Sequence, residues 1–447
     1  RDAQESRGLG DVYKRQVTRV VTPGTTLNAQ ALDETKNNYI MCIAYIGDHY
    51  GISSADITTG DYYVTEVDSE RKLLDEVNKY QPTEIICNEA FYISGIDIDD
   101  MKNRMGIVIY SLDAWYFSDE TAQMTLKDHF KVRDLEGLGL ADYDSGVVAA
   151  GALLKYLYET QKTTLSNLVA IHPYTTGKFM IIDSSTRRNL ELVETLREKQ
   201  KRGSLLWVLD KTRTAMGART LRSFVEQPLI ERMEIEERYD AIDEFNTNAI
   251  TREEIREYLN PVYDLERLIT RVTYQTANPR DLIAFRNSIH MLPPIKTLMS
   301  DFQSPLLKRL YEQMDTLDEL YELIERSIAE EPPLTLHDGG ILKEGYNEEV
   351  DRLRKAKTDG KSWLADLEAK EREKTGIKNL KIKYNKVFGY YLEVTNSFKD
   401  LVPDYFTRKQ TLANAERFIT PELKELEDVI LGAEDKLICL LYTSDAA

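Results

Sequence analysis

The chain has 447 residues, of which 42% are hydrophobic, and its 58 Lys or Arg against 76 Asp or Glu give a formal net charge of −18. This length suffices for roughly three domains with packed cores. A charge this negative argues against indiscriminate nucleic-acid binding, because the field of the whole body would repel a phosphate backbone. Any contact with nucleic acid must therefore be confined to a local patch.

Cysteine, histidine and hydropathy patterns limit the remaining function classes. The spacings of Cys42, Cys87 and Cys439 suit neither a disulfide framework nor a zinc site, and the five histidines show no paired ligand spacing. We expect reduced thiols, no metal and no bound cofactor. No apolar run approaches the ~20 residues that span a bilayer, and the first twenty residues lack a secretory signal, so we expect a cytoplasmic protein without a membrane partner.

The first patterned region predicts a small α/β domain. Residues 39–67 alternate apolar and polar side chains in three short runs separated by glycine–aspartate turns, which is typical of hairpin-connected strands. A helical pattern ending at Pro82 follows, and then the apolar runs EIIC and GIVIY. Helices and strands therefore mix up to about residue 140.

Beyond Tyr143 the strand signal fades, and apolar residues recur three and four apart. Helix stop and start signals punctuate this region, for example at Gln227-Pro228 and Asn278-Pro279. We expect six or more helices between about 145 and 330. Trp207, in the apolar run LLWVL, is expected in the core.

Two charged helical segments flank the last part of the chain. Residues 342–374 carry only a thin apolar stripe and predict an arm of roughly 45 Å, if Gly360 does no more than bend it. A returning helix begins after Thr420, the expected cap, with Pro421 in its first turn. The chain is therefore expected to leave along one helix and return along another.

The segment between these helices reverses the sign of the charge. Residues 375–420 contain eight Lys or Arg and four Asp or Glu, and residues 377–397 alternate well enough for two strands. Cations and small donors here suit phosphate oxygens and would position a duplex without reading its sequence. The candidate DNA contacts are Lys381, Lys383, Asn385, Lys386, Arg408, Lys409, Thr411 and Asn414. Alternatively, the lysines only form a solvated face that keeps an exposed hairpin soluble.

At these residues a family resemblance emerges. NKVFGYYLEV, 385–394, followed by YFTRKQTLANAERFITPELKELED, 405–428, resembles the clamp domain of the MutS family of bacterial DNA mismatch repair proteins. Four earlier blocks resemble this family in the same order: TRVVTPGT at 18–25, DITTGDYYVTE at 56–66, the stretch 183–229, and GYNEEVDRLR at 345–354.

The resemblance implies a multidomain fold: a ribonuclease H-like α/β connector, a helical core with long lever helices, and a small β-rich clamp at the lever tip. It also implies a homodimer that holds double-stranded DNA, with MutL as a partner. ATP and Mg belong to the family's ATPase domain, which would follow the returning helix, and the mismatch-reading domain would precede Thr18. We expect neither domain in this chain, and therefore no enzymatic activity of its own.

The resemblance also suggests how the chain divides. Residues 1–16 and 438–447 are expected to be extraneous or truncated tails, because neither continues the family pattern. The expected parts are 17–22, the end of the mismatch-binding domain; 23–142, the connector; 143–365, the core and outgoing lever; 366–420, the clamp; and 421–437, the returning lever.

Two alternatives of other classes stay open at this point. Asp48, Asp56 and Asp61 lie on or beside the first predicted strands and could bind magnesium for phosphodiester hydrolysis, although glycine–aspartate pairs are also ordinary turn chemistry. A structural coiled-coil scaffold is the second alternative. The interruption of the apolar seam at Gly360 argues against it. Arg187 and Arg188 could bind phosphate or an acidic partner, or form salt bridges where core and connector meet.

Overall fold

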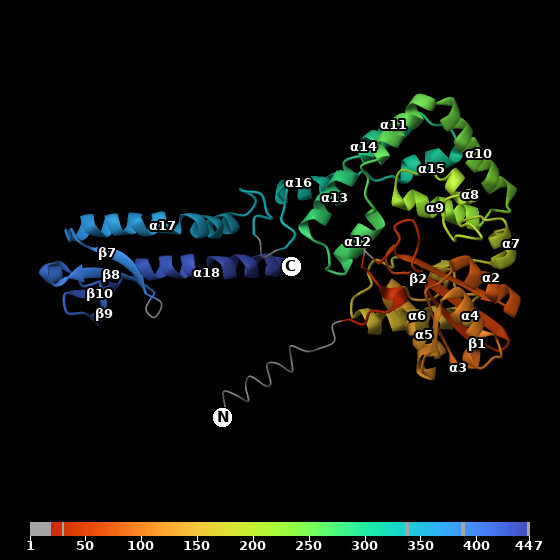
Figure 1. Ribbon diagram of the computed structural model, residues 1–447, viewed down its shortest axis with the longest axis horizontal. Coiled ribbons are helices and arrows are strands. Elements are labelled where there is room, and N and C mark those ends of the chain that lie inside the picture. The colour runs from red at the N-terminus through yellow and green to blue at the C-terminus, as the bar shows by residue number, and fades with distance from the viewer. Residues whose placement is uncertain (1–18, 29–30, 336–338, 386–388, 445–447) are drawn as a thin grey trace. The chain divides into compact units, whose positions relative to one another are not determined.

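The computed structural model describes residues 19–28, 31–335, 339–385 and 389–444, with the side chains of a few residues inside helices left out (Figure 1). The chain separates into two compact units. The first falls within residues 1–277 and 284–321, and the second within 278–283 and 322–447. No helix in the described ranges is long and apolar enough to cross a membrane.

A six-stranded mixed sheet organises the first half of the first unit. Its strands are β1 (Ile40–Ile46), β2 (His49–Asp56), β3 (Asp61–Val67), β4 (Glu84–Cys87), β5 (Val108–Ser111) and β6 (His172–Pro173), in the order β5-β4-β1-β2-β3-β6. β1, β2 and β3 pair antiparallel, while β4 is parallel to β1 and β5 is parallel to β4. The three strands predicted within 39–67 are confirmed.

Alternation along β1 explains why helices cover both faces of this sheet (Figure 1). Ile40 and Cys42 belong to one apolar cluster, and Met41 and Ile43 belong to another. The first cluster includes residues of α5 (Asp119–Phe130) and α6 (Ser145–Gln161), and the second includes residues of α2 (Glu70–Tyr80). The short helices α3 (Glu89–Tyr92) and α4 (Ile98–Met105) add to the second cluster.

Short helices make up the rest of the first unit, so the prediction of six or more helices is confirmed. They are α7 (Ser184–Asn189), α8 (Leu205–Leu209), α9 (Ala215–Glu226), α10 (Arg232–Thr247), α11 (Ala249–Leu259), α12 (Leu265–Thr273), α13 (Pro279–Ile289), α14 (Leu292–Met299), α15 (Pro305–Gln313) and α16 (Asp318–Ser327), of which α13 and α16 continue into the second unit. The expectation that Trp207 lies in the core is wrong, because its side chain is 47% exposed. α8 is little more than one turn long, and Leu206 is its buried residue.

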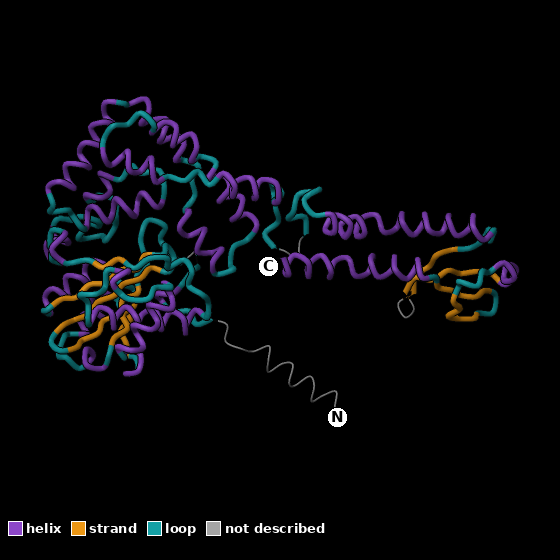
Figure 2. The backbone as a smooth tube through the Cα atoms, turned by 180° about the vertical axis from the view of Figure 1, so that it is seen from behind, coloured by secondary structure: helices purple, strands orange, loops and turns teal. Residues whose placement is uncertain are grey.

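Two long helices lie side by side in the second unit, as both views show (Figures 1 and 2). α17 (Glu348–Thr375) has 28 residues and a length of ~42 Å, and it runs through Gly360 without interruption. A Cβ at Gly360 would lie 3.0 Å from Cγ1 of Ile430 on α18 (Pro421–Ser444), so this glycine allows the helices to approach closely. Thr420 caps α18 as predicted, since its Oγ1 accepts a hydrogen bond from Leu423 N at 3.1 Å.

A four-stranded antiparallel sheet lies between α17 and α18 in the chain. Its strands are β7 (Lys381–Asn385), β8 (Gly389–Thr395), β9 (Thr407–Thr411) and β10 (Ala415–Ile419), in the order β7-β8-β10-β9. β7 and β8 confirm the two strands predicted in 377–397, and their turn lies outside the described residues. Leu392 and Phe418 form an apolar cluster with Leu364 of α17 and Leu423 of α18, so one sheet face is anchored on the helices.

Candidate nucleic-acid interface and domain junction

The opposite face of the four-stranded sheet carries the first group of predicted contacts. Lys381 and Lys383 are two residues apart on β7, so they share this face, and both are exposed. Lys383 Nζ lies 2.7 Å from Glu393 Oε1 on β8, and this hydrogen bond raises the pKa of Lys383. Lys381 lies opposite Glu393 in the pairing of β7 with β8 but makes no salt bridge within the described residues, since the Glu393 carboxylate is taken by Lys383.

Arg417 of β10 joins this face, although sequence reasoning did not select it. It lies opposite Glu393 on β8 and Gln410 on β9, and its Nη1 donates to Gln410 Oε1 at 2.7 Å. Its guanidinium also lies 4.4 Å from the ring centroid of Tyr391. Successive side chains of a strand point to opposite faces, so the adjacent Arg417 and buried Phe418 lie on opposite faces, and this is the signal that could have revealed Arg417.

The second group of predicted contacts lies at the far edge of the sheet. Arg408, Lys409 and Thr411 are on β9, Asn414 follows in the next turn, and all four are exposed. The pairing of β9 with β10 is irregular and leaves Lys409 without an opposite residue, as in a β-bulge. Lys409 makes no ion pair within the described residues and therefore presents a charge that no salt bridge neutralises there.

A buried carboxylate partly compensates this second group. Arg408 Nη1 lies 3.6 Å from Glu416 Oε1, which also lies 2.9 Å from Lys399 Nζ. The hydrogen bond from Lys399 is the main reason why the pKa of Glu416 is lowered. One carboxylate facing two cations leaves a net positive charge at this edge.

The strand order separates the two groups. β7 and β9 are the two edges of the sheet, three strand spacings apart, which corresponds to about 14 Å. The structure therefore brings Lys381 and Lys383 together, and Arg408 and Lys409 together, at opposite edges. Asn385 ends β7 and is half-buried, while Lys386 lies outside the described residues.

The three aspartates considered for a magnesium site do not converge. Asp48 lies in the turn before β2, whereas Asp56 ends that strand and pairs with Asp61 of β3. Asn37 Nδ2 donates to Asp56 Oδ2 at 3.0 Å and to Asp61 Oδ2 at 2.9 Å, so an amide bridges these two carboxylates. No group of three His, Cys, Asp or Glu among the described residues could hold a metal ion.

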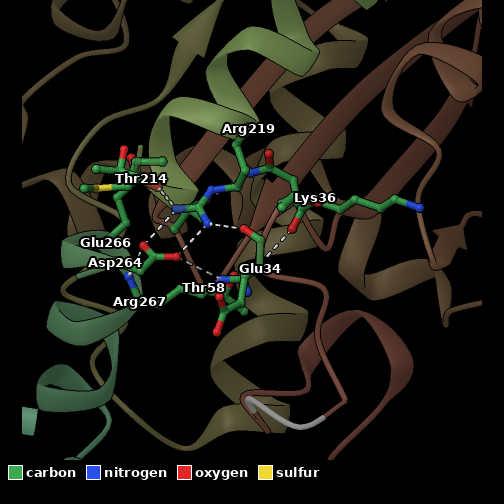
Figure 3. Close-up of polar contacts among 12 residues, drawn as sticks. Glu34, Lys36, Thr58, Thr214, Arg219, Asp264, Glu266 and Arg267 are labelled. Carbon is green, nitrogen blue, oxygen red and sulfur yellow. Dashed lines mark hydrogen bonds and ion pairs between the residues drawn. The ribbon is translucent and has the colours of Figure 1, made fainter. Parts of the chain in front are cut away.

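A second polar site lies inside the first unit, where the segment before β1 meets the helical part (Figure 3). The side chain of Arg219, on α9, is 4% exposed. Its Nη1 and Nη2 donate to the Asp264 carboxylate at 2.6 and 2.8 Å, and Nη2 donates to Glu266 Oε2 at 2.6 Å. Burial alone would lower the pKa of Arg219, but these hydrogen bonds raise it.

Arg219 and Arg267 extend this site to the segment 33–36. Arg219 Nη1 donates to the carbonyl oxygen of Glu34 at 2.8 Å. Arg267 Nη2 donates to the carbonyl oxygens of Asp33 and Lys36 at 3.1 and 2.7 Å. We call this set of contacts the arginine junction; it fastens the strand-bearing part of the unit to α9 and α12. Sequence reasoning did not select Arg219.

Comparisons with known proteins agree with this architecture. Residues 38–169 match MutS domain II, and residues 185–441 match MutS domain III. The sheet-bearing part, the helical part and the antiparallel sheet define the connector and core domains of a DNA mismatch repair protein. The chain belongs to the MutS family, as the resemblance predicted.

Two relatives illustrate the similarity. The DNA mismatch repair protein MutS of Lachnoclostridium phytofermentans is 65% identical over 431 residues, which cover 96% of this chain and 46% of the relative. The MutS protein of Ruminiclostridium cellulolyticum is 49% identical over 435 residues, which cover 97% of this chain and 50% of the relative. The chain thus spans about half the length of the curated relatives it matches.

Proposed function

We propose that this chain is the central part of a MutS-type protein, in which the four-stranded sheet is a clamp that holds duplex DNA by its phosphate backbone. The observation that carries the proposal is the reversal of charge at this sheet: residues 375–420 hold eight Lys or Arg against four Asp or Glu on a chain of net charge −18, and Lys381 and Lys409 form no salt bridge within the described residues. Phosphate contacts of this kind hold a duplex without reading its sequence.

The separation of the two cationic edges supports the same proposal. About 14 Å between β7 and β9 is comparable to the ~12 Å width of the DNA major groove, so the edges can reach phosphates on both sides of a groove. Lys381 and Lys383 would contact one strand, and Arg408, Lys409, Thr411 and Asn414 the other. Asn385 and Lys386 are proposed contacts near the β7–β8 turn.

The remaining parts follow from membership of the family. The order β5-β4-β1-β2-β3, with β4 and β5 parallel to β1, supports a ribonuclease H-like connector. We propose α17 and α18 as levers that couple DNA binding to the ATPase domain, where ATP and Mg act in the whole protein. A homodimer with MutL as partner, working in the bacterial cytoplasm, completes the proposal. The domain limits expected from the sequence are 23–142, 143–365, 366–420 and 421–437; because α6 and β6 belong to the sheet-bearing part, we propose that the connector extends through them.

Charge reversal at β9 should abolish most DNA binding. Four or five phosphate contacts give a log–log salt slope of roughly −4, and the double variant Arg408→Glu/Lys409→Glu should reduce it to about −2 with an affinity loss of ~100-fold. Fluorescence anisotropy of a labelled duplex of ~40 base pairs across a salt series measures both quantities. Matched and mismatched duplexes should bind about equally, since backbone contacts carry no sequence information.

A matched control separates local contact from overall charge. Lys211→Glu/Arg213→Glu makes the same change of charge at exposed positions of the first unit and should leave the slope unchanged. An equal loss in both double variants would show that only the overall field matters, and an unchanged slope in the β9 variant would refute the clamp proposal.

A further inference from the structure

A cavity of about 570 Å³ lies within the first unit, between the sheet-bearing part, α7, the segment 193–199 and α9, and its charged lining is mostly cationic although the chain is acidic. Seven Lys or Arg and two Glu line it, on a protein of net charge −18. This volume is within the range of small-molecule sites, roughly 300–1,000 Å³. The cavity is therefore large enough for an organic anion.

Arg187 and Glu226 are charged groups in this cavity whose hydrogen bonding is incomplete within the described residues; Glu226 Oε1 forms no hydrogen bond there. The side chain of Arg187 is 7% exposed, yet its Nε and Nη1 form no hydrogen bond within the described residues. Glu226 Oε1 lies 3.4 Å from Arg187 Nη1 and 3.3 Å from Arg222 Nη2, so two guanidinium groups share one carboxylate. Arg187 Nε is therefore a buried charged donor without an acceptor. Leaving such a donor unsatisfied is unfavourable, so an incoming anion that accepts its hydrogen bond would be stabilised.

The neighbouring cations differ in how well they are neutralised. Lys79, 11% exposed, is 3.2 Å from Glu76, and Arg219 is saturated by its carboxylates in the arginine junction. Arg188 and Lys199 are exposed at the rim and form no salt bridge within the described residues. Lys36 is likewise exposed and forms no salt bridge within the described residues, so the excess positive charge lies with Arg187, Arg222, Lys36 and these rim residues.

Apolar side chains complete the lining and indicate what kind of anion fits. Tyr39, Pro82, Ile107 and Val193 face the same cavity as the cations. Arginine pairs suit the planar, bidentate recognition of phosphate, and an apolar wall suits an organic body attached to it. Inorganic phosphate alone would leave that wall unused.

We propose that this cavity binds a small phosphate-bearing molecule of nucleotide size, with its phosphates on Arg187 and Arg222 and its organic part on the apolar wall. The inference does not depend on the DNA-binding proposal, since the cavity lies in the first unit and the clamp sheet in the second. The ligand would touch residues on both sides of the arginine junction and stabilise it by mass action.

Isothermal titration calorimetry of the 447-residue chain with ADP and with inorganic pyrophosphate tests the proposal. We expect one site, with ADP bound more tightly than pyrophosphate and an affinity about tenfold or more lower in Arg187→Gln. Arg188→Gln, at the exposed rim, should lower the affinity less and keeps the test available if Arg187→Gln does not fold. Thermal unfolding should shift upward with ADP in the unsubstituted chain.

Two control variants test whether ADP binding depends on this cavity in particular. Arg202→Gln removes the same charge from an exposed position outside the cavity and should leave ADP binding unchanged. Arg408→Glu/Lys409→Glu should also leave it unchanged, which separates this site from the clamp. The proposal would be overturned if ADP did not bind, or if Arg187→Gln and Arg188→Gln bound ADP as tightly as the unsubstituted chain. Equal affinities for ADP and pyrophosphate would also overturn it.

Discussion

Replacing Arg219 by methionine should destabilise the first unit by about 3–5 kcal/mol, because it removes the bidentate partner of the largely buried Asp264 carboxylate. Asp264 keeps only the longer ion pair with Arg267, whose Nε lies 3.8 Å from Asp264 Oδ2. The side chains of Arg219 and Asp264 are 4% and 16% exposed, so water cannot restore the missing hydrogen bonds fully. The carbonyl oxygen of Glu34 loses its donor as well. Urea unfolding measures the loss, and hydrogen exchange should show faster opening of residues 33–37.

An exposed ion pair provides the matched control for this prediction. Arg232 and Glu236 lie 2.7 Å apart with side chains 85% and 53% exposed, so Arg232→Met should cost less than about 1 kcal/mol. Adding Asp264→Asn to Arg219→Met should restore part of the stability, since it removes a charge that has lost its bidentate partner but keeps an oxygen to cap α12. Equal losses in Arg219→Met and Arg232→Met would contradict a structural role for the arginine junction.

Local patterns predicted much of the fold. Alternation and glycine turns in 39–67 correspond to β1, β2 and β3, and the Thr420-Pro421 signal corresponds to the start of α18. These features depend on neighbouring residues only, so a single sequence contains them. The prediction for Trp207 was wrong because an apolar run indicates only that its residues favour burial. It does not indicate whether a short helix such as α8 packs against another element that buries them.

The candidate sites were less predictable because they depend on long-range pairing. The cations of residues 375–420 were visible in the sequence as a reversal of charge. Their arrangement was not, because β10 inserts between β8 and β9, and this order places Arg408 and Lys409 at the edge opposite Lys381. Arg219 meets Asp264 across 45 positions and Glu34 across 185. No periodicity within a helix signals such a contact.

Gly51 is the position where one added methyl group should cost most. It lies in β2, and a Cβ there would be 1.9 Å from the carbonyl oxygen and 2.1 Å from the carbonyl carbon of Ser145, at the start of α6. Because both atoms are backbone, no side-chain rotation relieves the overlap. The helix must lift from the sheet, and Gly146 N, which donates to Glu66 Oε1 at 2.6 Å, must move with it.

We therefore expect Gly51→Ala to lower the free energy of unfolding by about 3 kcal/mol or more, at the upper end of overpacking effects. α6 is buried along most of its length, so a shift of its first turn is transmitted to the apolar cluster that it shares with β1. Gly177→Ala is the control, since that glycine is exposed and a Cβ there meets nothing within 4 Å. The change in the free energy of unfolding of Gly177→Ala should stay within about 0.5 kcal/mol. If Gly51→Ala were as stable in urea as the unsubstituted chain, α6 would not approach β2 this closely.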